Sequence, residues 1–373
     1  MQVNPKMRQK SRTLTLFTAM TLFAVLAITV QTSAGGTPHQ ITTFNAPGAG
    51  TGAGQGTYAI GINVWGSIVG YYMDGNNVNH SFLRNPNGSF AEFDPTGSAG
   101  TLPLGLNLEG AITGYYADES GVSHGFLRAP DGAITPFDVP DAGTGAGQGT
   151  YSANINPFGV IAGWYVDGNN LNHGFLRAPD GAITTFDAPG AGMGAGQGTS
   201  TAEFSALNPA GAVTGWYVDL SNVCHGYLRA PDGSFTTFNP TGSLCTVSLS
   251  INLEGAITGW YVYASIVYHG YLRAPDGSFT TFNVPGAGKG ASQGTLPANI
   301  NDFRVITGEY VDASNVYHGF VRDPDGIITT FNVPGAGRGS GQGTLPASNN
   351  LEGTITGYYV DASNVYHGFL RSE

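Results

Sequence analysis

The chain of 373 residues is rich in glycine and poor in charge, with 58 glycines, 10% charged residues and a formal net charge of −11. So acidic a chain cannot neutralise a run of phosphates, which excludes a basic nucleic-acid-binding protein of the usual kind. The glycine content disfavours a helical bundle, because each glycine inside a helix costs about 1 kcal/mol. The 41% of hydrophobic residues disfavour a charged, disordered chain.

The N-terminal segment has the three parts of a secretory signal. A basic start (6–12) is followed by an apolar run (14–30) and a group of small residues (32–35). We therefore predict a signal peptide over 1–34 and one exported domain over 35–373, located outside the cell, in the periplasm or at the cell surface. The alternative is an uncleaved membrane anchor, because the apolar run is nearly long enough to span a bilayer. If the signal is cleaved, the mature chain has no membrane span.

From residue 41 onward one unit recurs seven times, at intervals of 44 to 52 residues. In chain order, a unit holds a short apolar segment ending in Asn, a segment such as GVIAGWYVD (159–167), the string His-Gly-Phe-Leu-Arg, a Pro-Asp-Gly turn and a segment such as AITTFD. The string begins, with small changes, at His80, His124, His173, His225, His269, His318 and His367. Segments of β-branched and aromatic residues between such turns predict short antiparallel strands.

Asparagine ends the first segment of every unit: Asn63, Asn107, Asn156, Asn208, Asn252, Asn301 and Asn350. Three residues later comes glycine in six units and Arg304 in the other. Asn at the first position and Gly at the fourth predict a type I turn between the first and second strands.

Four short strands in a repeat of this length are typical of a β-propeller blade. The second strand, such as AITGWYV (256–262), is apolar or small on both faces, as expected for burial between neighbouring blades. We predict an all-β, seven-bladed β-propeller of four-stranded antiparallel blades. The alternative is a β-solenoid.

The two ends of the repeat region complement each other. The first strand after the signal, ITTF (41–44), has the sequence of a fourth strand, whereas the last unit stops at its third strand, HGFLRSE (367–373). We predict that the N-terminal strand completes the last blade, so that the ring closes 3+1 and leaves no sheet edge.

The repeated motif resembles that of a known bacterial family. GINVWGSIVG (61–70) with NHSFLR (79–84) resembles the extracellular HAF-repeat family. The resemblance implies an exported repeat protein and brings no established activity. This chain has Gly after His in six units and Ser81 in one, where the family name implies Ala.

An aspartate ends the second strand in six units: Asp74, Asp118, Asp167, Asp219, Asp312 and Asp361. Tyr263 replaces it in the fifth unit. We expect a hydrogen bond between each of these Asp side chains and the His of the same unit. A His–Asp pair can orient a catalytic base, but sevenfold repetition favours a structural role, so no catalytic residue is predicted.

The same six aspartates are our candidate ligand-binding residues. In a propeller the loops between second and third strands share one face with the crossovers between blades, which places Asp, Asn and Gln side chains together. Such a face can bind a glycan through several weak sites. The clustered oxygens of Asp74–Asn77 and Asp167–Asn170 make Ca²⁺ a weak candidate, and no other cofactor is predicted.

Two further repeated features are expected to be structural. The glycine-rich crossovers, such as 47–57, lack the Lys and following helix of a phosphate loop, so we predict flexible surface loops. The arginine of the third strand is expected to pair locally or to cap a hairpin in each unit: Arg84, Arg128, Arg177, Arg229, Arg273, Arg322 and Arg371.

Cys224 and Cys245 are the only cysteines. Cys224 precedes the fourth His string and Cys245 follows a shortened crossover, so both are expected near one face of the ring. Because an exported protein favours paired cysteines, we predict a disulfide between them and no metal site.

Function is expected where the repeat breaks. Glu309 stands where other units have Trp or Tyr, Arg304 replaces a turn glycine, and 199–204 is an insertion that carries Glu203. An ion pair between Glu309 and Arg304 is the simplest expectation.

We predict a non-enzymatic binding or structural module for an unknown extracellular glycan or protein. The alternatives are a lectin-like propeller and a glycan hydrolase or lyase with an axial site, for which the two glutamates are the candidates. Nucleic acids are not expected partners.

Overall fold

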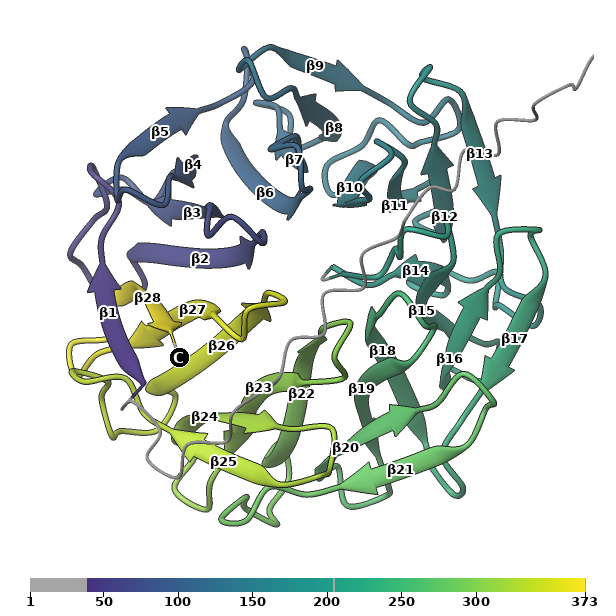
Figure 1. Ribbon diagram of the computed structural model, residues 1–373. Coiled ribbons are helices and arrows are strands. Elements are labelled where there is room, and N and C mark those ends of the chain that lie inside the picture. Colours follow the sequence, from purple (N-terminus) through teal and green to yellow (C-terminus); the bar gives the residue numbers. More distant parts are fainter. Residues whose placement is uncertain (1–38, 204, 373) are drawn as a thin grey trace, which may run out of the picture. The chain divides into compact units, whose positions relative to one another are not determined.

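The computed structural model describes residues 39–203 and 205–372, so the predicted signal peptide over 1–34 lies outside the described residues. The described chain is all-β and contains 28 strands. They form seven four-stranded blades around a central axis, which we number I to VII from β2 onward (Figure 1). In this part of the chain, no helix is long and apolar enough to cross a membrane.

Each blade is an antiparallel meander whose first strand lies nearest the axis (Figure 1). The first strands are β2 (Gly56–Ile62), β6 (Gly100–Leu106), β10 (Gly149–Ile155), β14 (Gly198–Thr201), β18 (Cys245–Ile251), β22 (Gly294–Ile300) and β26 (Gly343–Asn349). The second strands are β3 (Ile68–Met73), β7 (Ile112–Ala117), β11 (Ile161–Val166), β15 (Val213–Val218), β19 (Ile257–Val262), β23 (Ile306–Val311) and β27 (Ile355–Val360). The third strands are β4 (Asn79–Arg84), β8 (Ser123–Arg128), β12 (Asn172–Arg177), β16 (Cys224–Arg229), β20 (Tyr268–Arg273), β24 (Tyr317–Arg322) and β28 (Tyr366–Ser372). The outer strands are β5 (Phe90–Phe93), β9 (Ile134–Phe137), β13 (Ile183–Phe186), β17 (Phe235–Phe238), β21 (Phe279–Phe282), β25 (Ile328–Phe331) and β1 (Gln40–Phe44).

The N-terminal strand closes the ring as predicted. β1 pairs antiparallel with β28, from Gln40 opposite Ser372 to Phe44 opposite Gly368. Blade VII therefore consists of three C-terminal strands and one N-terminal strand, and the 3+1 closure is confirmed. The closure gives β28 a hydrogen-bonded neighbour on each side.

The hydrophobic core lies between consecutive blades. In one example, Val69 and Phe93 of blade I pack with Ile112 and Phe126 of blade II. The last two side chains are fully buried, and burying one such side chain stabilises the fold by about 1.5 to 3 kcal/mol. Equivalent clusters recur around the ring, which explains why the second strand is apolar on both faces.

The predicted turns between first and second strands are present and are linked to one another. In Asn301, Oδ1 accepts the backbone N–H groups of Phe303 and Val305 at 3.0 Å, and Nδ2 donates to the carbonyl of Asn350 in the next blade at 3.0 Å. Asn350 in turn donates to the carbonyl of Asn63 at 3.2 Å. The same bond joins each of the seven asparagines to the next, so they form a closed ring of hydrogen bonds. We call this the asparagine ring and the side of the molecule that carries it the asparagine face.

The repeated arginines bond locally in part, as expected, and also reach across to the neighbouring blade. Four of them donate to the carbonyl of the next residue, at 3.3 to 3.5 Å: Arg128, Arg177, Arg273 and Arg322. The guanidinium of Arg128 in blade II stacks over the ring of Phe93 in blade I, 4.9 Å from its centroid. All seven arginines make this contact, at 4.8 to 5.1 Å. The interaction is a cation–π contact that ties each third strand to the outer strand of the preceding blade.

The glycine-rich crossovers are held by hydrogen bonds and differ in this from the flexible loops we expected. In the crossover to blade III, Gln148 Oε1 accepts the backbone N–H of Gly145 at 2.9 Å, and its Nε2 donates to Asn170 Oδ1 at 3.0 Å. The N–H of Gly147 also donates to the carbonyl of Gly121 in blade II at 2.8 Å. Glutamine side chains thus join crossovers to the loops between second and third strands, and we call the side that carries both the crossover face.

Candidate functional site

The repeated aspartates of the crossover face first serve their own turns. In blade IV, Asp219 Oδ1 accepts the backbone N–H groups of Ser221 and Val223 at 2.8 and 2.9 Å. These hydrogen bonds hold the pKa of Asp219 below its usual value. In blade II the hydroxyl of Ser120 adds a further bond, and the pKa of Asp118 falls to about 2.

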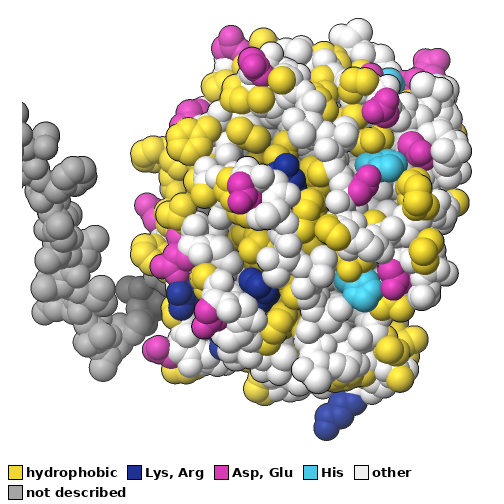
Figure 2. All heavy atoms as spheres, turned by 90° about the vertical axis from the view of Figure 1, so that its right-hand side faces the viewer, with side chains coloured by type: hydrophobic (Ala, Val, Ile, Leu, Met, Phe, Trp, Pro, Cys, Tyr) yellow, Lys and Arg dark blue, Asp and Glu magenta, His cyan; other side chains and the backbone are white. Residues whose placement is uncertain are grey.

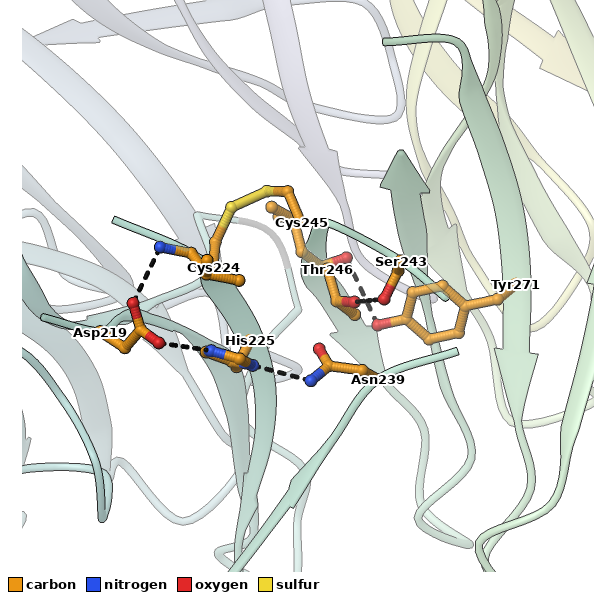
Figure 3. The surroundings of a disulfide bond; sticks show 10 residues. Asp219, Cys224, His225, Asn239, Ser243, Cys245, Thr246 and Tyr271 are labelled. Carbon is orange, nitrogen blue, oxygen red and sulfur yellow. Dashed lines mark hydrogen bonds and ion pairs between the residues drawn. A yellow bond between two sulfur atoms is a disulfide. The ribbon is translucent and has the colours of Figure 1, made fainter. Parts of the chain in front are cut away.

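The second oxygen of each aspartate faces the histidine. The expected hydrogen bond forms in blades IV, VI and VII, at 3.2 to 3.3 Å, whereas the pairs of blades I, II and III are 3.6 to 3.9 Å apart. Asp219 Oδ2 lies 3.2 Å from His225 Nε2, and His225 Nδ1 lies 2.7 Å from the amide of Asn239, which follows the outer strand (Figure 3). Every repeated His has such a second partner, an Asp or an Asn. Viewed from the side, the ring shows histidines at its surface beside acidic side chains (Figure 2).

These bonds satisfy the polar groups of each blade from within. They explain why the six aspartates repeat, and they leave only the exposed edges of the carboxylates free to contact a ligand. A ligand-binding role for these residues therefore remains a prediction. In blade V, where Tyr263 replaces the aspartate, its ring packs on His269 at 5.3 Å.

One blade brings together groups that could hold a metal ion. In blade I, ligand atoms of His80, Glu92 and Asp94 lie within 4.8 Å of one another. Glu92 is peculiar to this blade, because the equivalent residue is threonine in five other blades and Pro136 in blade II. His80 Nδ1 already lies 2.8 Å from Asp94 Oδ2. We had predicted no metal site here, and no second observation at this cluster points to an ion.

The Ca²⁺ candidates are also internally bonded. Asp74 Oδ1 accepts the N–H groups of Asn76 and Val78 at 2.8 Å, and Asn76 Nδ2 donates to Oδ2 at 3.2 Å. Asp167 and Asn169 repeat this arrangement in blade III. The oxygens that we expected to face a cation bind their own loop.

The disulfide joins blades IV and V on the crossover face. Cys224 begins β16 and Cys245 begins β18, and the two residues are parallel neighbours with a Cα–Cα distance of 4.5 Å (Figure 3). In five other blades this close approach is made by a glycine such as Gly149, where a Cβ would collide with the carbonyl of Ser123. The sequence change from glycine to cysteine thus occurs where two strands are already adjacent.

The fourth residue of the second strand is aromatic in every blade except VI, and we call the seven residues at this position the aromatic column. The column contains Tyr71, Tyr115, Trp164, Trp216, Trp260 and Tyr358, with Glu309 as its only non-aromatic member. Rings of neighbouring strands pack against the column; for example, Tyr58 stacks on Tyr71 at 4.6 Å and contacts Tyr358 across the ring closure at 5.2 Å.

Glu309 lines a small axial cavity between blades V and VII. The cavity has a volume of about 120 Å³ and is bounded by Trp260, Leu296, Leu345 and Tyr358, among others. Glu309 is the only charged residue among those that line it. Burial raises the pKa of Glu309 to about 8, although its own backbone N–H partly opposes the shift.

The expected ion pair between Glu309 and Arg304 is wrong. Arg304 lies in the turn before β23 and its guanidinium bonds to Glu254 of blade V, with Nε at 3.0 Å and Nη2 at 2.6 Å from Oε2. The turn points its side chain along the asparagine face, whereas Glu309 faces the axis from the middle of β23. Being close in sequence did not bring these two side chains together.

The insertion of blade IV crosses toward the axis. Asn154 of blade III donates to the carbonyl of Ala202 at 2.7 Å and accepts the N–H of Ala206 at 2.8 Å. Asn299 of blade VI donates to Ser205 Oγ at 2.7 Å. Side chains of two other blades therefore position the insertion.

Glu203 of this insertion faces a second axial cavity. The cavity has a volume of about 400 Å³ and is lined by Trp216, the disulfide, Val247 and Glu203. It shares Leu249 and Trp260 with the smaller cavity, so the two adjoin. Glu203 is exposed to the water of the channel, but the surrounding protein is close enough that burial raises its pKa.

Sequence reasoning identified Glu309, Glu203 and the disulfide, and it missed the groups that surround them. Tyr268, Tyr317 and Tyr366 begin the third strands of blades V to VII, where the other blades have small or polar residues. Tyr268 packs edge-on against Trp260 at 5.0 Å. Three consecutive tyrosines at one repeat position were the signal that could have located the aromatic side of the channel.

Comparisons with known proteins give the fold and no family. No family model matches the chain, and the search of curated proteins found no match. The resemblance to the HAF-repeat family therefore remains a prediction.

Similar folds occur among solved structures of different function. Virginiamycin B lyase from Staphylococcus aureus is 16% identical, with 90% of this chain and 100% of that chain covered and a TM-score of 0.58. A prolyl endopeptidase is 9% identical, with a TM-score of 0.53 and with 86% of this chain and 55% of that chain covered. This chain therefore spans about half of the length of the endopeptidase. A lectin from Burkholderia pseudomallei is 11% identical, with coverages of 82% and 95% and a TM-score of 0.49. At these identities the likeness to the lyase and the endopeptidase shows the β-propeller fold alone.

Proposed function

We propose that this protein is an exported, non-enzymatic binding protein whose ligand enters the axial channel from the crossover face. The observation that carries this proposal is the contrast between repeated and unique residues. The repeated His, Asp, Asn and Arg side chains bond within or between blades, whereas Glu309, Glu203 and three members of the aromatic column line two adjoining cavities: Trp216, Trp260 and Tyr358.

Export rests on the N-terminal sequence and on the disulfide. The segment 1–34 has the composition of a signal peptide, and a disulfide persists in an oxidising compartment. Expression of the full chain in a bacterial host tests this part. A secreted protein with its N-terminus at residue 35 supports cleavage, and a membrane-bound full-length protein supports the anchor.

The binding proposal is tested with the purified domain over 35–373. Its thermal unfolding is measured with panels of soluble glycans, organic cations and neutral small molecules, since a ligand of the folded state raises the midpoint. The variant Leu249→Trp fills the boundary shared by both cavities, and Leu244→Trp is the matched control because Leu244 is exposed on a crossover. If a ligand no longer raises the unfolding midpoint of Leu249→Trp but still raises that of Leu244→Trp, binding in the channel is supported. If the ligand raises the midpoint of both variants, binding in the channel is contradicted.

A lectin-like function is the second candidate, favoured by a polar groove in blade VI. The groove has a volume of about 520 Å³ and is lined by Asp312, Ser314, His318, Asn332 and Arg338, among others. A glycan shift that is lost in Arg338→Ala and retained in Leu249→Trp would favour this site. Turnover of any panel member would favour the hydrolase or lyase alternative. If Glu309→Gln abolished this turnover, Glu309 would be assigned as a catalytic residue.

A further inference from the structure

Glu309 is a carboxylate without a counter-charge. The side chain of Glu309 has no partner other than its own backbone N–H among the hydrogen bonds and ion pairs of the described residues. The nearest cation in sequence, Arg304, is bound to Glu254. The seven repeated arginines are stacked between blades. A carboxylate enclosed in this way is costly unless a cation or a proton neutralises it.

The walls around Glu309 are aromatic and apolar. Trp260 and Tyr358 occupy the equivalent positions of the two flanking blades and line the same cavity. Leucine, proline and alanine side chains complete the lining. A hard metal ion requires several oxygen ligands, and this cavity offers one carboxylate and one phenol. Aromatic faces beside a carboxylate instead match an organic cation, which the ring quadrupoles attract and the carboxylate neutralises.

The size of the two cavities fits a ligand with a small charged head and a larger body. A cavity of about 150 Å³ holds benzene, so the 120 Å³ around Glu309 suits an ammonium group with its attached methyl groups. The adjoining 400 Å³ cavity leads past Leu249 and Trp260 and holds the second carboxylate, Glu203.

We propose that the axial cavity between blades V and VII binds an organic cation, with an alkylated ammonium group seated between Trp260, Glu309 and Tyr358. This inference rests on the proposed function and names the chemical class of its ligand. Glu203 faces the part of the ligand that extends into the larger cavity.

Cation binding is coupled to a proton. The titratable groups whose charges interact with Glu309 are the phenols of Tyr317 and Tyr358, and burial raises the pKa of both above the ordinary range. They therefore stay neutral while Glu309 titrates near pH 8. Since the cation needs the carboxylate, binding at neutral pH releases a proton, and affinity rises about tenfold per pH unit between roughly pH 6 and 8.

The test compares choline with its neutral carbon isostere, 3,3-dimethylbutan-1-ol, by titration calorimetry on the domain over 35–373. At about pH 8.5 the unmodified domain is expected to bind choline roughly tenfold more tightly than the isostere. Glu309→Gln removes this preference and the pH dependence. Glu254→Gln, which alters an exposed carboxylate on the asparagine face, retains both.

Two results would overturn the inference: equal binding of choline and isostere, or no choline binding at all by the unmodified domain. If Glu309→Gln does not fold, proton release by the unmodified domain, measured in buffers of different ionisation enthalpy, replaces it as the deciding readout. A different ligand whose binding is lost in Leu249→Trp would leave the proposed function intact while the cation inference fails. Both fail if no ligand is sensitive to that variant.

Discussion

The asparagine ring lies in the turns between first and second strands, whereas the residues that distinguish the axial channel lie on the second strands, and the two regions differ in how their side chains are used. In the ring, seven identical side chains make seven equivalent bonds, and each buried polar group has a partner in its own turn or in the next blade. In the channel, one position carries six aromatic residues and one glutamate, and the glutamate has no counter-charge in the described chain. The comparison indicates that residues repeated in every blade build the ring, whereas unique residues remain available for a ligand.

The largest effect is expected when β1, the strand that closes the ring of blades, is removed, because both regions depend on the closed ring. A chain that begins at Pro47 lacks β1, exposes the edge of β28 and removes Phe44 from under Arg84. We expect the loss to be comparable with the whole stability of a domain, about 5 to 15 kcal/mol, so that cooperative unfolding disappears. Thermal unfolding and gel filtration measure it against a chain that begins at His39. An unchanged melting curve would show that the 3+1 closure is dispensable.

The second test titrates the unpaired glutamate. The pKa of Glu309 is about 8 in the folded protein against 4.5 ordinarily, so folding favours its protonated form. Stability is therefore full below about pH 4.5 and is lost as the pH rises through 8, by at most roughly 5 kcal/mol because channel water reduces the effect. Urea unfolding of the unmodified domain and of Glu309→Gln across this range measures the difference. A gap between the two proteins that stays constant with pH would mean that Glu309 is already neutralised.

The third test concerns the one covalent link between blades in the described chain. Replacing both Cys224 and Cys245 by Ser opens a loop with a sequence separation of 21 residues. The expected cost is about 3 kcal/mol, mainly through the unfolded chain. Chemical denaturation with and without a reducing agent checks it, since reduction should lower the stability of the unmodified domain and leave the double variant unchanged.

A single member of the asparagine ring gives a smaller effect. Asn301→Ala leaves two turn N–H groups and the carbonyl of Asn350 without this partner, at a cost of about 2 kcal/mol. The exposed Asn169 donates only to Asp167 of its own loop, so Asn169→Ala is the control and should change stability by less than about 0.5 kcal/mol. If both variants lost the same free energy of unfolding, the asparagine ring would contribute no more to stability than an exposed loop hydrogen bond.

The smallest effect on stability is expected at the turn of blade VI, where an exposed arginine replaces the glycine of the other blades. Arg304 adopts a φ of 62°, where the other blades have glycine. Arg304→Gly removes the exposed ion pair with Glu254, worth up to about 1 kcal/mol, and relieves a backbone strain of similar size. The net change should be below about 1 kcal/mol, and salt should destabilise only the unmodified domain. A larger loss would place this ion pair among the residues that build the ring.

Local chemistry made the blades predictable. The Pro-Asp-Gly turns, the Asn turns and the alternation of strand residues act over a few positions, so the sequence predicted four strands per unit, and the spare strand 41–44 predicted the closure. The contacts between blades were not predictable in this way. The partner of Arg128 lies one blade away, and the carbonyl that Asn350 reaches belongs to the first blade.

The sequence predicted the candidate site only as a position where one blade differs from the others, and it did not predict the surroundings of that position. Glu309 was visible because a carboxylate interrupts an aromatic column, but its surroundings depend on which side of the strand faces the axis. A simple pairing rule joined it to Arg304, and the turn geometry sends that arginine to Glu254.

The pairing of β1 with β28 also means that the ring can close only after the last strand of the chain has been synthesised. Gln40–Phe44 is the first described strand to be synthesised, and its partner residues lie more than 320 positions later. Until the end of the chain emerges, β1 has no edge to join, and such distant pairing is slow. During that interval the equivalent edge of a second copy is an equally good partner. Dilute refolding thus favours the closed ring, and crowded refolding favours two chains that have exchanged their first strands.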